Sequence, residues 1–463
     1  MLTHLQIRNF KAWHNTQAIR LAPLTVFFGS NSSGKSSINQ LLLMLKQTVQ
    51  SSDRRMALHL GDKKTVIELG TFWDVVYAHD NNEKMAFELE WQLPSEMTVT
   101  DVLSNQPYLG KSIKFTTEIG LPNRERQDLV VYHMSYQMGE PPNGLTVEMK
   151  RKSLDSNLDH YFLTASPYHL VPKQSVVLPH PIHFYGFPSE VTAQYENAEF
   201  VHDFTLVLEK RLQAIYYLGA LREPPFRYYI KSGENPESVG WRGERAVDAI
   251  LAAQNKLIKT GSQTLPFPAM MGYWLKKMGL IDTFEVKQIA PNRRDYEVLV
   301  KNVGVKDHVN LTDVGFGVSQ VLPVLVQCFY APHGSTTILE QPEVHLHPSA
   351  QAVLADLFID AISATDDREK PHNIQLLIES HSEHFLRRLQ RRIAEQKIRA
   401  IDTAIYFCEM TSSGSILNRL EIDDYGNIKN WPHQFFGDDV GDLAAMTEAA
   451  IQRQMKVVRN PIF

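Results

Sequence analysis

Few cysteines and no long hydrophobic run set the first limits on this chain. Cys328 and Cys408 are the only cysteines, and both stand beside apolar residues. This pattern excludes a disulfide framework and favours buried thiols in a reducing compartment. No apolar run approaches the roughly 20 residues that a membrane helix needs, and the N-terminus lacks the apolar core of a secretion signal. We therefore expect a soluble, cytoplasmic protein with no membrane partner.

The chain also lacks the excess of positive charge that holds many proteins on nucleic acid. Its formal net charge is −5 over 463 residues, so only a local basic face would favour DNA binding. It has no internal repeat and no sustained heptads, which argues against a solenoid or a long coiled coil. The length is sufficient for two or three domains with a well-buried core.

What the chain does contain, close to its N-terminus, is a complete phosphate-binding loop. An apolar run, Leu24–Phe28, precedes the loop and a helical run, Ile38–Leu43, follows it, which is the context that the motif requires. Lys35 can reach the outer phosphates of a nucleotide, and the Ser36 hydroxyl is placed to coordinate Mg²⁺. The residues that we predict to bind the nucleotide here are Gly29, Ser30, Asn31, Ser32, Ser33, Gly34, Lys35, Ser36 and Ser37.

A second motif follows the buried run Thr336–Leu339, which predicts a strand. Glu340 at its end takes the place of the Mg²⁺-associated carboxylate of phosphate-loop enzymes. The next residue is usually a glutamate that polarises the attacking water, but here it is Gln341, which can orient a water and cannot accept its proton. Two alternatives stay open. Glu343 supplies the missing base, or hydrolysis is slow and the protein is mainly an ATP-gated switch.

Histidines follow two of the predicted strands. We interpret His345 and His347 as residues that shape the loop after the acidic strand, because the sequence offers no further ligand pair at zinc spacing. His381 follows the predicted strand Ile374–Ile378 and should project from the same sheet edge as the phosphate loop. There it can form a hydrogen bond with the γ-phosphate.

Two glycines stand directly before another predicted helix. Gly315 and Gly317, with Ser319 after them, form a second candidate nest of backbone N–H groups for an anion. A chain needs only one such nest for its own nucleotide. The second is explained if it closes over the nucleotide of a partner subunit.

Together these motifs resemble the ATP-binding-cassette class of ATPases, in the soluble branch related to the overcoming-lysogenization-defect nucleases. The resemblance covers about residues 1–95 and 300–410, and it includes Ile7–Ala12, Pro342–Pro348 and Ser380–His384. It implies ATP and Mg²⁺ as ligands. It also implies a head-to-tail dimer in which each ATP lies between one phosphate loop and the Gly315–Gly317 nest of the other subunit.

The resemblance also implies the fold. We expect an α/β protein with an ABC-type ATPase head, in which a parallel core sheet carries the phosphate loop beside an antiparallel N-terminal sheet. A mixed α+β insertion should split this head. The expected parts are an N-terminal lobe at 1–104, the insertion at 105–287, a C-terminal lobe at 288–412 and an appendage at 413–463.

The function that we expect depends on the ATPase motifs described above and on the nuclease domain that does not accompany them. The Toprim nuclease domain of that branch is absent, and relatives without it work with a separately encoded nuclease or toxin. The resemblance therefore implies an ATP-gated sensor or scaffold of a bacterial anti-phage defence system. The alternative is an ATPase that acts directly on DNA in repair or genome maintenance. An arginine-rich helix predicted over Glu383–Gln396 supports this second function, unless its basic face is merely solvated.

Overall fold

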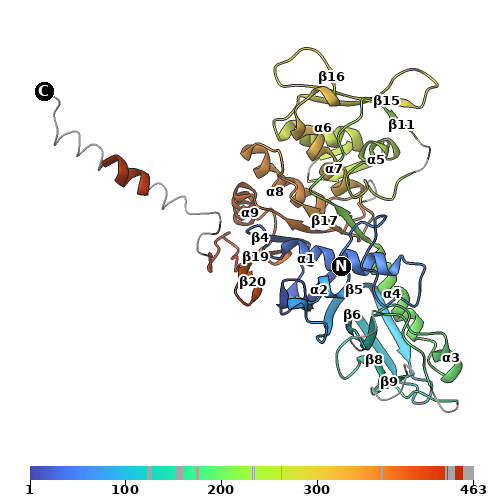
Figure 1. The fold of residues 1–463 in the computed structure, drawn as a ribbon. Coiled ribbons are helices and arrows are strands. Elements are labelled where there is room, and N and C mark those ends of the chain that lie inside the picture. Colours follow the sequence, from blue (N-terminus) through green and yellow to red (C-terminus); the bar gives the residue numbers. More distant parts are fainter. Residues whose placement is uncertain are drawn as a thin grey trace.

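Two sheets of different type form the frame of the molecule (Figure 1). One contains parallel strands and carries the phosphate loop, and the other is antiparallel. The computed structural model describes residues 1–122, 128–152, 160–173, 177–231, 233, 235–261, 263–366, 369–432, 435 and 444–451.

The core sheet has the strand order β10-β17-β18-β4-β19-β20. All neighbours in this order are parallel except the last pair, because β20 returns from β19 as a hairpin. Its strands are β4 (Leu24–Gly29), β10 (Ile215–Leu218), β17 (Thr336–Glu340), β18 (Gln375–Glu379), β19 (Thr403–Thr411) and β20 (Gly414–Arg419). The predicted parallel pairing of the C-terminal strands is confirmed.

The antiparallel sheet has the order β2-β1-β5-β6-β7-β8-β9, with β3 also paired to β1. It belongs to the N-terminal part of the chain, as predicted. Its strands are β1 (Leu2–Phe10), β2 (Trp13–Asn15), β3 (Ile19–Arg20), β5 (Met85–Thr100), β6 (Pro107–Gly120), β7 (Val130–Met138), β8 (Leu145–Arg151) and β9 (Tyr161–Ser166).

The core strands are buried on both faces, because successive side chains of a strand point to opposite sides of its sheet. Phe27 of β4 and Leu377 of β18 belong to a core shared with α1 and the antiparallel sheet. Val26 and Ile378, one position away, belong to a second core with α7, α8 and α9. The phosphate-loop strand is therefore held between two cores.

Helices cover both faces of the core sheet, and Figure 1 shows α7, α8 and α9 on the side away from the antiparallel sheet. None of the described helices is long and apolar enough to cross a membrane. The labelled helices of seven or more residues are α1 (Lys35–Val49), α4 (Val201–Gln213), α5 (Ala246–Ala252), α6 (Phe267–Lys277), α7 (Phe316–Tyr330), α8 (Pro348–Ser363) and α9 (Glu383–Ala394). The shorter ones are α2 (Phe72–Val75), α3 (Glu190–Gln194), η1 (Tyr77–His79), η2 (Leu311–Asp313) and η3 (Ala400–Asp402).

The residues predicted as an insertion, 105–287, contribute to both sheets. They supply β6 to β9 of the antiparallel sheet and the edge strand β10 of the core sheet. β5 and β6 pair with each other across the predicted boundary at residue 104. Two smaller sheets complete the strands. One contains β11 (Tyr229–Ile230) and β14 (Thr283–Gln288) together with β15 (Asp295–Lys301) and β16 (Val309–Asn310), which follow the predicted insertion, and the other pairs β12 (Leu257–Thr260) with β13 (Gln263–Pro266).

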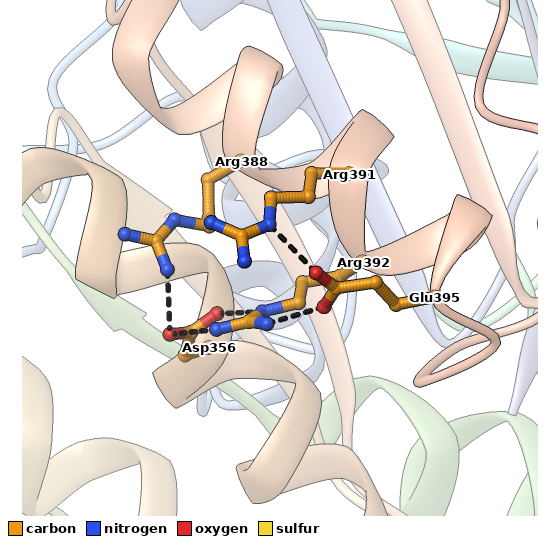
Figure 2. A network of polar contacts seen from close by, with 5 residues as sticks. All are labelled: Asp356, Arg388, Arg391, Arg392 and Glu395. Carbon is orange, nitrogen blue, oxygen red and sulfur yellow. Dashed lines mark hydrogen bonds and ion pairs between the residues drawn. The ribbon is translucent and has the colours of Figure 1, made fainter.

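The basic residues of α9 bind carboxylates within the chain (Figure 2). The Arg392 guanidinium donates to both oxygens of Asp356 on α8, at 2.6 and 2.8 Å, and also to Glu395. Arg388 donates to the same aspartate at 3.4 Å, and Arg391 donates to Glu395 at 2.6 Å. At the start of the same helix, Arg387 pairs with Glu383 at 3.2 Å. This helix therefore uses its arginines for internal ion pairs.

Removing the shared carboxylate should weaken the contact between α8 and α9. Asp356→Ala leaves Arg388 and Arg392 without their common acceptor, and Asp356 is only 7 % exposed. Loss of one partner from a buried pair costs about 3 kcal/mol of unfolding free energy. Glu383→Ala, which removes an exposed pair with Arg387, should cost at most about 0.5 kcal/mol. Urea denaturation measures both, and equal losses would contradict the prediction.

Candidate functional site

The predicted phosphate loop lies between a buried strand and a helix, as the motif requires. β4 ends at Gly29 and α1 begins at Lys35. Gly29 has φ +145° and a Cβ there would lie 2.2 Å from the Cys408 carbonyl oxygen. Gly34 has φ +90° and packs against the Trp13 ring, which leaves no room for a side chain. Both glycines are therefore required by the backbone and its neighbours.

The lysine and the serine of the loop are already engaged within the chain. The Lys35 ammonium donates to the carbonyl oxygens of Gly29 at 3.1 Å and Ser30 at 2.7 Å. Burial lowers the pKa of Lys35, and nearby Glu379 opposes this. The Ser36 hydroxyl lies 2.9 and 3.1 Å from the two carboxylate oxygens of Glu379. The residue predicted to coordinate Mg²⁺ thus contacts a carboxylate from β18.

A pocket of about 380 Å³ opens over this loop. It brings together the predicted loop residues with Gln341 and His381, so the ends of β17 and β18 meet the phosphate loop at one sheet edge. Gly29 and Ser30 are not among the lining residues, and their carbonyl oxygens accept hydrogen bonds from the Lys35 ammonium. The lining residues are Lys11, Ala12, Asn31, Ser32, Ser33, Gly34, Lys35, Ser36, Ser37, Gln40, Gln341, Glu379 and His381.

Two carboxylates stand side by side at this edge, because Glu340 and Glu379 are register partners in adjacent parallel strands. The Tyr217 hydroxyl of β10 donates to Glu340 at 3.0 Å. Burial, and then the charge of Glu379, raise the pKa of Glu340 to about 7. Burial also raises the pKa of Glu379, although the Ser36 hydroxyl and Lys35 oppose this. Glu379 is the nearer of the two to the phosphate loop.

Glu343 lies apart from the pocket. It is 7 % exposed, and its Oε1 accepts a hydrogen bond of 2.6 Å from the backbone N–H of His381. The carboxylate thus holds the segment that carries His381. Burial and the charge of Lys35 lower the pKa of the His381 imidazole. His381 itself lines the pocket, where we expected a γ-phosphate sensor.

The second nest lies away from the pocket of its own chain. Gly315 is the N-cap of α7, and the Ser319 hydroxyl donates to the Phe316 carbonyl at 2.9 Å. Gly317 packs near His345, whose carbonyl oxygen would lie 3.2 Å from a Cβ added there. None of the predicted nest residues is among those that line the pocket. Of the predicted site residues, Asn31 to Ser37, Gln341 and His381 line the pocket, whereas Gly29, Ser30, Glu340, Glu343 and the nest residues do not.

The histidines after the acidic strand shape the loop, as interpreted from the sequence. His347 is the N-cap of α8, and its Nδ1 accepts a hydrogen bond from the Ser349 N–H at 3.3 Å. His345 has φ +62°, in the left-handed region. The described residues contain no cluster of three or more His, Cys, Asp or Glu side chains able to hold a metal ion.

Sequence reasoning missed Glu379, Lys11 and Gln40 as pocket residues. The rule that selected Glu340, an acidic residue at the carboxyl end of a buried parallel strand, applies equally to Glu379 and would have found it. The Lys11 ammonium binds the Gln40 side-chain oxygen at 2.6 Å beside the loop. This contact joins residues 29 positions apart and has no local sequence signal.

Three family models match segments of the chain. Residues 1–168 match the model described as "AAA ATPase domain", and residues 233–387 match "AAA domain, putative AbiEii toxin, Type IV TA system". Residues 398–446 match "Protein of unknown function (DUF3696)". The chain carries a phosphate-loop ATPase domain. No curated protein matches it.

Solved structures similar to this ATPase include heads of SMC proteins. One, an SMC head bound to the C-winged helix domain of ScpA, shares 11% identity, with a TM-score of 0.44 and 91% of this chain and 98% of that chain covered. The SMC head domain from Thermotoga maritima shares 10% identity, with a TM-score of 0.39 and 91% and 99% covered. An SMC head with an extended coiled coil, bound to a ScpA domain derived from Pyrococcus furiosus, shares 11%, with a TM-score of 0.40 and 91% and 96% covered.

The contact between Ser36 and Glu379 predicts a dependence of nucleotide binding on this carboxylate. Glu379→Ala removes both the charge and the acceptor of the Ser36 hydroxyl, and should weaken Mg²⁺-dependent ATP binding about tenfold or more. Glu379→Gln keeps an acceptor without the charge. Titration of a fluorescent ATP analogue, with and without Mg²⁺, separates the two contributions. Unchanged affinity in both variants would exclude a role for Glu379 at the site.

Proposed function

We propose that this protein is an ATP-gated switch that binds ATP and Mg²⁺, closes as a head-to-tail dimer and turns ATP over slowly. Its partner would be a separately encoded effector in a bacterial anti-phage defence system. The observation that carries the proposal is the single pocket that unites Lys35, Ser36, Glu379 and Gln341. Such a pocket suits a triphosphate with Mg²⁺, since the ammonium would face the phosphates and the hydroxyl and carboxylate would face the metal.

The oxygen donors at the pocket suit Mg²⁺. This ion prefers a few hard oxygen ligands together with water and substrate phosphates, and needs no cage built entirely from protein. The Ser36 hydroxyl and the Glu379 carboxylate are already within 3.1 Å of each other. These two residues would hold the ion, with Glu340 beside them. Bound there, Mg²⁺ would neutralise charge on the phosphates.

Slow turnover is supported by the residue at position 341. Gln341 lines the pocket, where it can orient a water without accepting a proton. Glu343, the alternative base considered from the sequence, binds the His381 N–H instead and does not line the pocket. Of the described residues that line the pocket, Glu379 alone carries a carboxylate. It is therefore the acidic group placed closest to a bound phosphate.

We propose that a second copy of the chain binds here, because the Gly315–Gly317 nest does not line the phosphate pocket of its own subunit. Gly315 is exposed and Gly317 is half-buried, and a Cβ added at Gly315 would meet no atom within 4 Å. An open helix N-terminus of this kind suits an anion delivered from outside. Head-to-tail pairing would place the nucleotide of one subunit against it.

The effector and the defence role are supported by a separate observation. The model matched by residues 233–387 is described by reference to a toxin and a type IV toxin–antitoxin system. Direct action on DNA gains nothing from α9, since Arg388, Arg391 and Arg392 are paired with carboxylates. We therefore favour a protein effector over DNA as the partner.

Dimer closure should depend on Lys35. Lys35→Ala removes the cation that faces the outer phosphates, so ATP with Mg²⁺ should no longer convert monomer to dimer in analytical ultracentrifugation. The unchanged protein should dimerise with ATP and not with ADP. Lys63→Ala, on an exposed loop, is the matched control and should dimerise normally. An ATP-dependent dimer of the Lys35 variant would exclude the proposed mechanism.

The proposed partner can be identified by purification from the native host. A tagged chain should retain a second protein, encoded nearby, in an amount that changes between ATP and ADP conditions. The Lys35→Ala variant should retain the amount seen without ATP. Recovery of DNA alone, released steeply by salt, would replace the effector proposal with the DNA alternative.

A further inference from the structure

A buried arginine lies beneath the turn that follows β17. Arg222 is 5 % exposed and comes from the segment after β10. One of its terminal nitrogens donates to the carbonyl oxygen of Glu340 at 3.0 Å and to that of Gln341 at 3.4 Å. The stretch Tyr217–Pro224 therefore reaches the acidic strand of the site twice, once through Arg222 and once through Tyr217.

The turn that Arg222 contacts is conformationally demanding. Gln341 has φ +42°, in the left-handed region that non-glycine residues rarely adopt, and Pro342 follows it. Such a backbone persists only where its surroundings fix it. The Gln341 N–H donates to the Glu379 carbonyl at 2.8 Å, and Arg222 binds the carbonyl on the other side of the residue. The peptide groups on both sides of the Gln341 Cα are thus held by hydrogen bonds.

A contribution to stability alone does not explain why a charged arginine is buried at this position. Its other two nitrogens, Nε and Nη1, are buried and have no hydrogen-bond partner among the residues that the structure describes. A buried cation with unpaired N–H groups is costly, and an apolar residue of similar volume often gives an equal or more stable protein. Glu343, Glu340 and Tyr217 face the guanidinium. Burial lowers the pKa of Arg222 to about 10, so it stays charged at neutral pH.

We propose that Arg222 is a positioning residue that fixes the left-handed turn at Gln341 and thereby aims the Gln341 amide into the phosphate pocket. This inference rests on the proposed ATPase function. Arg222 is absent from the residues that line the pocket, whereas Gln341 is among them. Arg222 acts through Gln341, and it leaves phosphate binding to Lys35 and Ser36.

Arg222→Met tests the proposal, because methionine fills similar space and cannot donate to the two carbonyls. In the protein without nucleotide, hydrogen exchange of the Gln341 amide should accelerate about tenfold or more, while the amides of α1 stay unchanged. With ATP, kcat should fall about tenfold or more and the Kd for ATP should stay within about twofold. Arg222→Lys, which keeps a donor, should restore part of kcat.

Two comparisons keep the test decisive. Arg242→Met removes a half-exposed arginine that pairs with Glu223 on the same segment, at 3.2 Å, and should change neither exchange at Gln341 nor kcat. In a Gln341→Ala background, Arg222→Met should lower kcat no further, since both changes remove one function. Additive losses, or normal exchange at Gln341, would overturn the proposal.

The failure of this inference is distinguishable from failure of the ATPase function itself. If the unchanged protein binds no ATP, the proposed function is wrong, and the exchange measurement without nucleotide still reports whether Arg222 fixes the turn. If ATP binds and kcat is the same with and without Arg222, only the positioning role is wrong. A melting curve of each variant shows that loss of activity does not come from unfolding.

Discussion

The parallel register of β17, β18 and β4 is the constraint on which the rest of the site depends. Because these strands are hydrogen-bonded neighbours in one direction, their carboxyl ends reach the same edge of the sheet. Glu340 lies opposite Glu379, and Glu379 reaches the Ser36 hydroxyl of the helix that follows β4. A change of register by one residue would turn these side chains to the other face and separate them.

The residues around this edge form two layers with different tasks. The inner layer, with Lys35, Ser36 and Glu379, lines the pocket, and we propose that it binds phosphates and metal. The outer layer, with Arg222 and Glu343, is buried and binds backbone groups of the loops that carry Gln341 and His381. Ionisable residues therefore lie here both at the pocket surface and in the buried layer that holds the backbone of its loops.

The pairing of the α9 arginines shows how tertiary contacts change the meaning of a sequence pattern. A run with four arginines on one helix is typical of either a solvated basic face or a nucleic-acid contact. Asp356 of α8 binds two of them, and the other two pair with the first residue of α9 and with Glu395, which follows its last residue. The helix consequently contributes to packing between α8 and α9.

The sequence by itself determined the phosphate loop and the order of strands and helices after residue 336. It also predicted a helix after Gly315 and Gly317, although α7 begins at Phe316 and thus includes Gly317. These features depend on local spacing, apolar runs and capping residues, all of which lie within a few positions of one another. Only the tertiary structure decided that Ser36 contacts Glu379, 343 positions away, and that Arg222 supports the turn at Gln341. Which strands pair depends on burial of both faces of the sheet, and no local sequence pattern specifies that pairing.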